Sequence, residues 1–318
     1  MNFSLTPEQD ALRAAARELC ARFPDAYWRE LDRERRYPEE QVRALTDAGF
    51  LAALIPAEYG GLGLGVTEAS IILEEINRSG GHSAACHAQM YVMGALARHG
   101  SPEQKACWLP PVARGELRFQ AFSVTEPEAG SDTTAIRTTA LRDGDAWVVN
   151  GFKNWTSRIE QSDLLLLLAR TTPKEEVAKR TGGLSLFLVD LREARRAGTI
   201  DVQPVRTMFN YPTYQVTYRD LRIPAENLIG REGGGFRAIV DGWNAERILL
   251  AAEAIGDGTW FIERATAYAR GREVFGRPIG ANQGVQFPLA RAYADVQAAD
   301  LLRWKAAWLF DAGQRCGS

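Results

Sequence analysis

The stretch at residues 122–132, Phe-Ser-Val-Thr-Glu-Pro-Glu-Ala-Gly-Ser-Asp, marks the point where this chain changes from helical to extended periodicity. Its first residues predict a strand, which must break at Pro127 because proline has no backbone N–H to donate. Gly130 then permits a backbone with positive φ. The stretch therefore predicts a bent loop that offers N–H groups, a carboxylate and hydroxyls to a ligand. An ordinary strand-to-loop corner with an Asx-type turn at residues 131–132 is the alternative.

The segment before this stretch, residues 1–118, predicts a helical domain. Two capping boxes, Thr6-Pro-Glu-Gln9 and Ser101-Pro-Glu-Gln104, each place proline at the first helical position. The charged run at 29–36 is expected to be a solvated face or a loop. The glycine-rich segment 54–65 is interpreted as a connector, because it lacks the strand-to-helix context and the lysine of a phosphate-binding loop.

Residues 119–235 change to the period of two that is typical of strands, and residues 236–318 return to helix. Short strands without intervening helices predict an antiparallel β-sandwich or barrel in the middle domain. Two long helices, at 236–269 and 289–310, predict a C-terminal helical bundle. The fold class is therefore α+β and multidomain. The strand candidates are 135–142, 147–149, 164–169, 184–189, 202–206 and 215–221.

Composition argues against several classes of function. The net charge of −2 provides no basic excess for binding nucleic acid. No apolar run approaches the ~20 residues of a membrane span, and no signal-peptide pattern opens the chain. The four cysteines and three histidines show neither metal-ligand nor disulfide spacing. These observations predict a cytoplasmic protein without a metal site.

A second stretch, Asn150-Gly-Phe-Lys-Asn-Trp-Thr-Ser157, follows a hairpin signal at residues 143–145. Together with the first stretch it resembles the acyl-CoA dehydrogenase family of flavoproteins. The family pattern reads V-T-E-P-x-A-G-S-D and then N-G-x-K-x-W-[IT]-[ST]. A third match is Arg272-Glu-Val-Phe-Gly276, with Gln283 eleven residues after the arginine. The resemblance runs in the same order to residue 318.

The resemblance implies FAD as the cofactor and a fatty acyl thioester of coenzyme A as the substrate. The implied reaction removes a proton from the carbon next to the thioester carbonyl and a hydride from the following carbon, with the flavin as the redox group. Trp155 would pack beside the flavin ring, and the Ser157 hydroxyl would reach its N5 edge. From the residues alone, without the motif, an ordinary core tryptophan is the favoured interpretation of Trp155. The implied flavin contacts in these stretches are Phe122, Val124, Thr125, Trp155, Thr156 and Ser157.

Three downstream residues, Arg272, Phe275 and Gln283, resemble those that reach the adenine dinucleotide of a neighbouring subunit. Arginine suits this role because its planar fork binds pyrophosphate oxygens in a bidentate manner, although an arginine at a helix end is the simpler interpretation. This implied site predicts a homo-oligomer, a dimer or a tetramer. Ser131 would hydrogen-bond the coenzyme A arm.

The catalytic base must be a carboxylate whose pKa is raised by its surroundings. A minority of the family, including isovaleryl- and long-chain-type enzymes, carry this base on the first long helix of the last domain, just before an arginine. Counting back from Arg272, Glu246 falls at that position. Glu246 is therefore predicted as the base, with Asn244 and Arg247 in the substrate site. A surface glutamate paired with a helix neighbour is the alternative.

Two residues depart from the family pattern, and several questions stay open. Ser123 stands where alanine, glycine or cysteine is usual, and Glu128 adds a charge near the coenzyme A arm. The family's four-helix bundle would continue past residue 318, so the C-terminal domain is expected to be truncated. Electron-transfer flavoprotein is the implied electron acceptor. A flavin oxidase or monooxygenase, or an inactive fragment or non-catalytic subunit, remain alternatives.

Overall fold

The computed structural model describes residues 4–208, 210 and 212–316. These residues form two compact units, which are described separately. The first unit contains residues 4–30, 64–87 and 244–316, and the second contains residues 31–63 and 88–243 apart from 209 and 211. Helices α2 (Asp25–Glu34), α5 (Ala84–His99) and α8 (Gly235–Gly271) have residues in both units.

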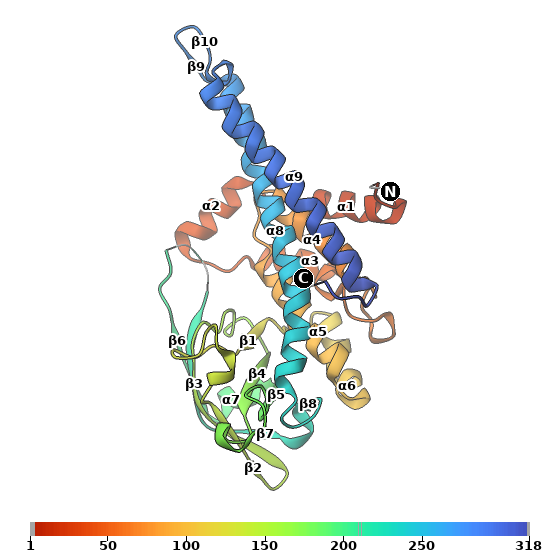
Figure 1. Ribbon diagram of the computed structural model, residues 1–318, viewed down its shortest axis with the longest axis vertical. Coiled ribbons are helices and arrows are strands. Elements are labelled where there is room, and N and C mark those ends of the chain that lie inside the picture. The colour runs from red at the N-terminus through yellow and green to blue at the C-terminus, as the bar shows by residue number, and fades with distance from the viewer. Residues whose placement is uncertain (1–3, 209, 211, 317–318) are drawn as a thin grey trace. The chain divides into compact units, whose positions relative to one another are not determined.

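The first unit is helical. The predicted capping box forms at Thr6, whose side chain accepts from the Gln9 N–H while the Gln9 side chain accepts from the Thr6 N–H. Figure 1 shows α8 and α9 side by side, and a Cβ on Gly258 would lie 2.9 Å from Val296, so glycine permits this close approach. Besides α5 and α8, the elements are α1 (Pro7–Cys20), α2 (Asp25–Glu34), α4 (Val66–Arg78), β9 (Glu273–Val274), β10 (Arg277–Pro278), η6 (Ile279–Ala281) and α9 (Gln283–Asp311).

Two polar contacts fix α9 against α4. The buried guanidinium of Arg303 donates to Glu74 at 2.6 Å and to Ser70 at 2.9 Å. At the far end of α9, the Asp311 carboxylate accepts from the backbone N–H groups of Val66 and Thr67, each at 2.8 Å. These N–H groups lie in the first turn of α4 and have no partner within the helix, so Asp311 acts as an N-cap supplied from a distant part of the chain.

The second unit carries the β domain. In the described part of the chain, β1–β8 join in one sheet of order β6-β7-β3-β2-β4-β5-β8, with β1 added beside β4. Most pairs are antiparallel, as predicted, but β4 pairs in parallel with β1 and β2. The strands are β1 (Ala121–Ser123), β2 (Thr139–Asp143), β3 (Ala146–Lys153), β4 (Leu164–Arg170), β5 (Leu184–Asp190), β6 (Ile200–Pro204), β7 (Tyr214–Pro224) and β8 (Leu228–Ile229).

The core of the β domain follows from its two most apolar strands. Every residue of β4 is buried, and all of β5 is buried except Asp190, which is why both strands are continuous apolar runs in the sequence. Trp147 packs edge-to-face on Phe187 at 5.5 Å between ring centroids. The other elements of this unit are α3 (Glu39–Asp47), η1 (Phe50–Ala52), η2 (Ala57–Tyr59), α6 (Pro102–Ala113), η3 (Thr133–Ala135), η4 (Lys174–Glu176), α7 (Leu191–Arg196) and η5 (Ala225–Asn227).

The α+β fold class is confirmed, and the differences from the sequence predictions are local. The charged run at 29–36 is mostly a solvated helix face, one of the two expected alternatives, because α2 continues to Glu34 and only Leu31 of the run is buried. The strand expected at 135–142 begins at Thr139, after the short helix η3. The domain boundaries after residues 118 and 235 stay predictions. Within the described ranges, no helix is long and apolar enough to cross a membrane.

Candidate active site

The first motif stretch forms the predicted bent loop. β1 ends at Ser123, and the loop then closes a tight turn in which Glu126 and Ala129 exchange backbone hydrogen bonds across exposed Pro127. Gly130 does not use the positive φ that glycine permits, so that part of the interpretation is wrong. Phe122, at the start of the loop, is half-buried and packs edge-to-face on Tyr91 at 5.7 Å.

A buried ion pair holds this loop in place. Lys153 is fully buried at the end of β3, and its Nζ lies 2.9 Å from Glu126 Oε1. The same Nζ donates to the Val124 carbonyl at 2.7 Å. Glu126 also accepts from the backbone N–H groups of Arg137 and Thr138, at 2.6 and 2.9 Å. The lysine of the second motif thus fixes the backbone of the first.

The electrostatics of this pair follow from its contacts. Burial alone would raise the pKa of Glu126, but the Lys153 ammonium and the N–H donors of Arg137 and Thr138 outweigh it and leave that pKa below its ordinary value. Burial lowers the pKa of Lys153 to about 8, against the opposing effect of Glu126. The carboxylate is therefore held ionised by its contacts within the protein.

Trp155 is held in an unusual conformation at the centre of the second motif. Its φ is +62°, which is uncommon for a non-glycine residue and strained for a bulky one. The preceding Asn154 donates its N–H to the Thr125 carbonyl at 2.8 Å, so the two motif stretches touch here. Trp155 is 54% exposed, so the structure contradicts the alternative of a core tryptophan.

The two residues after Trp155 are held by β7 and the residues before it. The Thr156 N–H donates to the Tyr214 carbonyl at 2.9 Å, and the Thr156 side chain is fully buried. The Ser157 hydroxyl donates to Thr213 Oγ1 at 3.1 Å. β7 therefore fixes one side of the turn that carries Trp155, and the loop after β1 fixes the other.

Ser131 lies in the same unit, on the exposed outer part of the first loop. The Asp132 carboxylate accepts from the Thr134 N–H at 3.2 Å and from the Thr134 hydroxyl at 2.5 Å. The hydroxyl bond, the larger effect, lowers the pKa of Asp132 together with the nearby charges of Arg180 and Lys174. The expected Asx-type turn is thus present and caps the short helix η3.

The predicted base and its neighbours lie on α8, in the first unit. Glu246 is half-buried, and Arg247 is exposed and donates to Asn244 Oδ1 at 3.2 Å. Seven residues along the helix, on the same face as Glu246, Glu253 pairs with His87 of α5 at 2.7 Å. This pair could not be found from the sequence, because the two residues are 166 positions apart.

The three residues assigned to the dinucleotide lie at one end of the first unit. Arg272 immediately precedes a hairpin of β9 and β10, whose two-residue turn is Phe275 and Gly276. Phe275 is fully exposed and has a φ of +53°, and Gly276 has a φ of +75°. Gln283 is exposed at the first position of α9. Their role at the dinucleotide of a neighbouring subunit stays a prediction.

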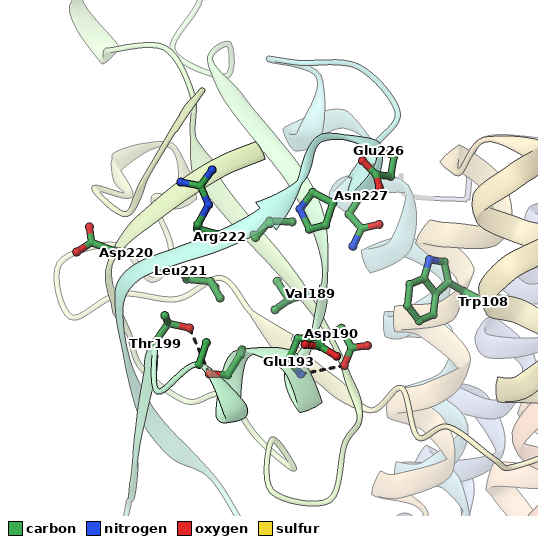
Figure 2. A pocket seen from close by; sticks show the side chains of 14 residues that line it. Trp108, Val189, Asp190, Glu193, Thr199, Asp220, Leu221, Arg222, Glu226 and Asn227 are labelled. Carbon is green, nitrogen blue, oxygen red and sulfur yellow. Dashed lines mark hydrogen bonds between the residues drawn. The ribbon is translucent and has the colours of Figure 1, made fainter. Parts of the chain in front are cut away.

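A separate pocket of about 510 Å³ lies elsewhere in the second unit. Figure 2 shows Trp108 of α6 on one side and Leu221 and Arg222 of β7 on the other. Three of its acidic residues already have structural partners: Asp190 caps α7, Asp220 accepts from Asn150 and Glu193 pairs with Arg196. None of the sequence-predicted site residues lines this pocket. In the described ranges, no group of three or more His, Cys, Asp or Glu side chains is arranged to hold a metal ion.

Comparison with known proteins decides the family. Models of the acyl-CoA dehydrogenase N-terminal, middle and C-terminal domains match residues 6–116, 121–221 and 233–318. The chain belongs to the acyl-CoA dehydrogenase family. It is therefore an oxidoreductase of a family that depends on FAD, and the predicted cofactor is confirmed.

Similar proteins span several acyl-CoA enzymes. The chain is 35% identical to acyl-CoA dehydrogenase FadE12 of Mycobacterium tuberculosis, over 100% of this chain and 80% of that protein. It is 32% identical to glutaryl-CoA dehydrogenase of Desulfococcus multivorans, over 99% and 80%. A glutaryl-CoA dehydrogenase structure in complex with glutaryl-CoA superposes with a TM-score of 0.90 at 32% identity, covering 98% of this chain and 78% of that one. Butyryl-CoA dehydrogenase of Megasphaera elsdenii gives 0.91 at 25% identity, covering 99% and 82%.

The residues of this acyl-CoA dehydrogenase family member fit a flavin. Trp155 presents an exposed aromatic side chain from a turn that is held on both sides, and Ser157 places a hydroxyl beside it. A flat, polar-edged ring needs these two features, an aromatic neighbour and hydrogen-bonding groups at its rim. In the other unit, exposed Arg272 has the chemistry to bind a pyrophosphate.

Proposed function

We propose that this protein is an acyl-CoA dehydrogenase that oxidises the α,β carbon–carbon bond of a coenzyme A thioester, with Glu246 as the base. The observation that carries the proposal is Trp155, exposed at positive φ in a turn that the loop after β1 and β7 hold in place. Strain of this kind persists only where surrounding contacts enforce it, and it clusters at functional sites. Because the family depends on FAD, FAD is the ligand we propose for this turn.

The proton transfer is assigned to Glu246. Its ionised carboxylate takes the proton from the carbon next to the thioester carbonyl, and the electron pair of that C–H bond becomes part of the new double bond. FAD, when bound, supplies the acceptor for the hydride that leaves the next carbon. Half-burial of Glu246 supports the role, since its side chain stays accessible to a substrate.

Other residues of the chain position the reactants in this proposal. Phe122, Val124 and Thr125 line the ring with backbone groups, and Trp155, Thr156 and Ser157 line it from the second motif. Ser131 binds the coenzyme A arm, and Asn244 and Arg247 lie in the substrate site. The hydrogen bond between Arg247 and Asn244 supports the last assignment, because it holds the two side chains together one turn apart on α8.

The assembly and the electron acceptor are also proposals. Arg272, Phe275 and Gln283 bind the dinucleotide of a second subunit, so the protein is a homo-oligomer, a dimer or a tetramer. A fully exposed phenylalanine at a hairpin tip supports this assignment, because such a side chain gains stability when a partner covers it. Electron-transfer flavoprotein is the proposed acceptor of the two electrons.

The visible absorption spectrum of the purified protein tests the function. Two flavin bands, shifted by added coenzyme A thioester, are the expected result. Turnover with electron-transfer flavoprotein and without hydrogen peroxide supports the dehydrogenase. Stoichiometric peroxide in air would instead identify a flavin oxidase. A protein that stays colourless with excess FAD would overturn the flavin site in this chain.

A further inference from the structure

Three hydroxyl groups meet in the core directly behind the turn that carries Trp155. Ser123 Oγ lies 3.0 Å from Thr156 Oγ1 and 2.8 Å from the Tyr218 hydroxyl. Ser123 and Thr156 are fully buried, and Tyr218 is 2% exposed. The three residues come from β1, from the second motif and from β7. This hydroxyl network therefore connects the turn to β1 and β7.

Three buried hydroxyl groups affect the stability of a core differently from apolar side chains. Burying a hydroxyl is unfavourable unless it is hydrogen-bonded, and apolar residues of the same shape would pack there without this requirement. Ser123 also occupies the motif position where alanine, glycine or cysteine is usual. The chain therefore carries a polar group where the family pattern does not call for one. Burial raises the pKa of Tyr218, so its hydroxyl keeps its proton and can donate.

The network acts on the turn through Thr156. The backbone N–H of Thr156 is held by the Tyr214 carbonyl at 2.9 Å, and its side chain is held by Ser123. Thr156 stands between Trp155, whose φ is +62°, and Ser157, whose hydroxyl reaches Thr213. Fixing both the backbone and the side chain of the central residue fixes the directions in which its two neighbours point.

We propose that Ser123, Thr156 and Tyr218 form a positioning network that sets Trp155 and Ser157 against the bound flavin. The inference rests on the proposed flavin role of this turn. It assigns Ser123 and Tyr218, which do not belong to the predicted contact set, as positioning residues. Removal of the network leaves the turn in place but lets Trp155 and Ser157 sample other orientations.

The expected effect is on cofactor binding and on the flavin spectrum. Ser123→Ala, Tyr218→Phe and Thr156→Val each remove one hydroxyl with little change in shape. Each should raise the dissociation constant of FAD about three- to tenfold, the range that one hydrogen bond represents. The visible bands of the bound flavin should also shift, because the indole and the Ser157 hydroxyl no longer hold one orientation. Thr156→Ser, which keeps the hydroxyl, should restore most of the affinity.

A matched control separates positioning from general stability. Thr171 and Ser185 form another hydroxyl pair in the same unit, at 2.8 Å, with no part in the turn. Thr171→Val should lower the melting temperature of the apoprotein as the network variants do, yet leave FAD affinity and spectrum unchanged. Apoprotein of each variant is titrated with FAD, and quenching of flavin fluorescence gives the dissociation constant.

The outcomes distinguish this inference from the proposed function. Trp155→Ala is titrated in parallel as a direct test of the flavin turn. If Trp155→Ala weakens FAD binding while Ser123→Ala and Tyr218→Phe change only thermal stability, the network is structural and the inference is overturned alone. If Trp155→Ala also leaves binding unchanged, the flavin placement fails and the inference fails with it. Weaker binding and shifted bands in both network variants, with rescue by Thr156→Ser, support it.

Discussion

The Lys153 ammonium nitrogen lies 2.9 Å from the Glu126 carboxylate and 2.7 Å from the Val124 carbonyl, with the lysine side chain fully buried. One side chain thus joins the two motifs that together mark the family in this chain. The place of the lysine in the second motif has a physical reason. Lys153 is the last residue of β3, and from there its side chain contacts Val124 and Glu126 in the loop that follows β1. Through these contacts the pair positions the backbone of the loop after β1.

The ion pair of Lys153 and Glu126 is expected to stabilise the folded protein by an amount that decreases in acid. The folded-state pKa of Glu126 lies below its ordinary value of 4.5, so its contribution is fully present above about pH 4.5 and is lost as the pH falls through the folded value. Glu126→Gln should lower the free energy of unfolding at pH 7 by about 3 kcal/mol, because it leaves Lys153 buried without its partner.

The difference between the parent protein and this variant should therefore shrink as the pH falls from 5 to about 3. Urea unfolding across that range measures it. Glu58→Gln, at an exposed carboxylate, serves as the control and should show no such trend. A constant difference down to pH 3 would mean that Glu126 is not held ionised by its partners.

Strain at Trp155 predicts an inverted order of glycine and alanine variants. At a φ of +62°, alanine is strained and glycine is not. Apoprotein with Trp155→Gly should therefore be more stable than apoprotein with Trp155→Ala by about 1 kcal/mol. Both should bind FAD more weakly than the parent, since both lack the indole.

The opposite order is expected at Leu141, an exposed position within β2, where glycine weakens a strand. Urea unfolding of the four variants gives both differences. If alanine were the more stable replacement at Trp155 as well, the positive φ would not exist in solution.

The conformation of the hairpin tip predicts that one substitution will stabilise the apoprotein and weaken FAD binding. Its two turn residues, Phe275 and Gly276, both have positive φ, as in a type I′ turn, for which Asn-Gly is the preferred sequence. Phe275→Asn should raise the free energy of unfolding of apoprotein by about 0.5 kcal/mol, because asparagine adopts this conformation more readily. It should also weaken FAD binding and subunit association.

Denaturant unfolding and sedimentation at several protein concentrations provide the two measurements. Arg272→Gln serves for comparison, since it should weaken FAD binding without stabilising the turn. Unchanged FAD affinity and assembly in Phe275→Asn would remove the hairpin from the dinucleotide site.

The sequence predicted those parts of the fold that depend on local signals. Capping boxes located helix starts at Pro7 and Pro102, and apolar runs located β4 and β5 nearly to the residue. For α2 the sequence left a solvated face and a loop open at 29–36, because that helix buries only Leu31. The parallel pairing of β1 with β4 could not be predicted, because strand partners in a sheet are chosen by tertiary packing.

In the candidate site too, features with a local sequence signal could be predicted, and contacts between distant segments could not. Motif spacing identified Trp155 and the loop at 122–132, and the structure explains how both are held. The hydroxyl network was missed because Ser123 and Tyr218 are 95 residues apart, and each alone is an unremarkable core residue. The one available signal was Ser123, a serine at a motif position where alanine, glycine or cysteine is usual. The pair of His87 and Glu253 was missed for the same reason, since it forms only when α5 packs against α8.

Anaerobic mixing of the FAD-loaded protein with acyl-CoA thioesters tests the central claim most directly. Straight-chain and branched probes, such as butyryl-CoA, octanoyl-CoA and isovaleryl-CoA, should include at least one that bleaches the visible flavin band of the parent protein. Glu246→Gln should retain FAD and bind the same thioester, but lose the bleaching by at least about a hundredfold in rate. Glu263→Gln, on the same helix and paired with Arg78, should bleach like the parent. Bleaching of the Glu246→Gln variant at the parent rate would contradict the account.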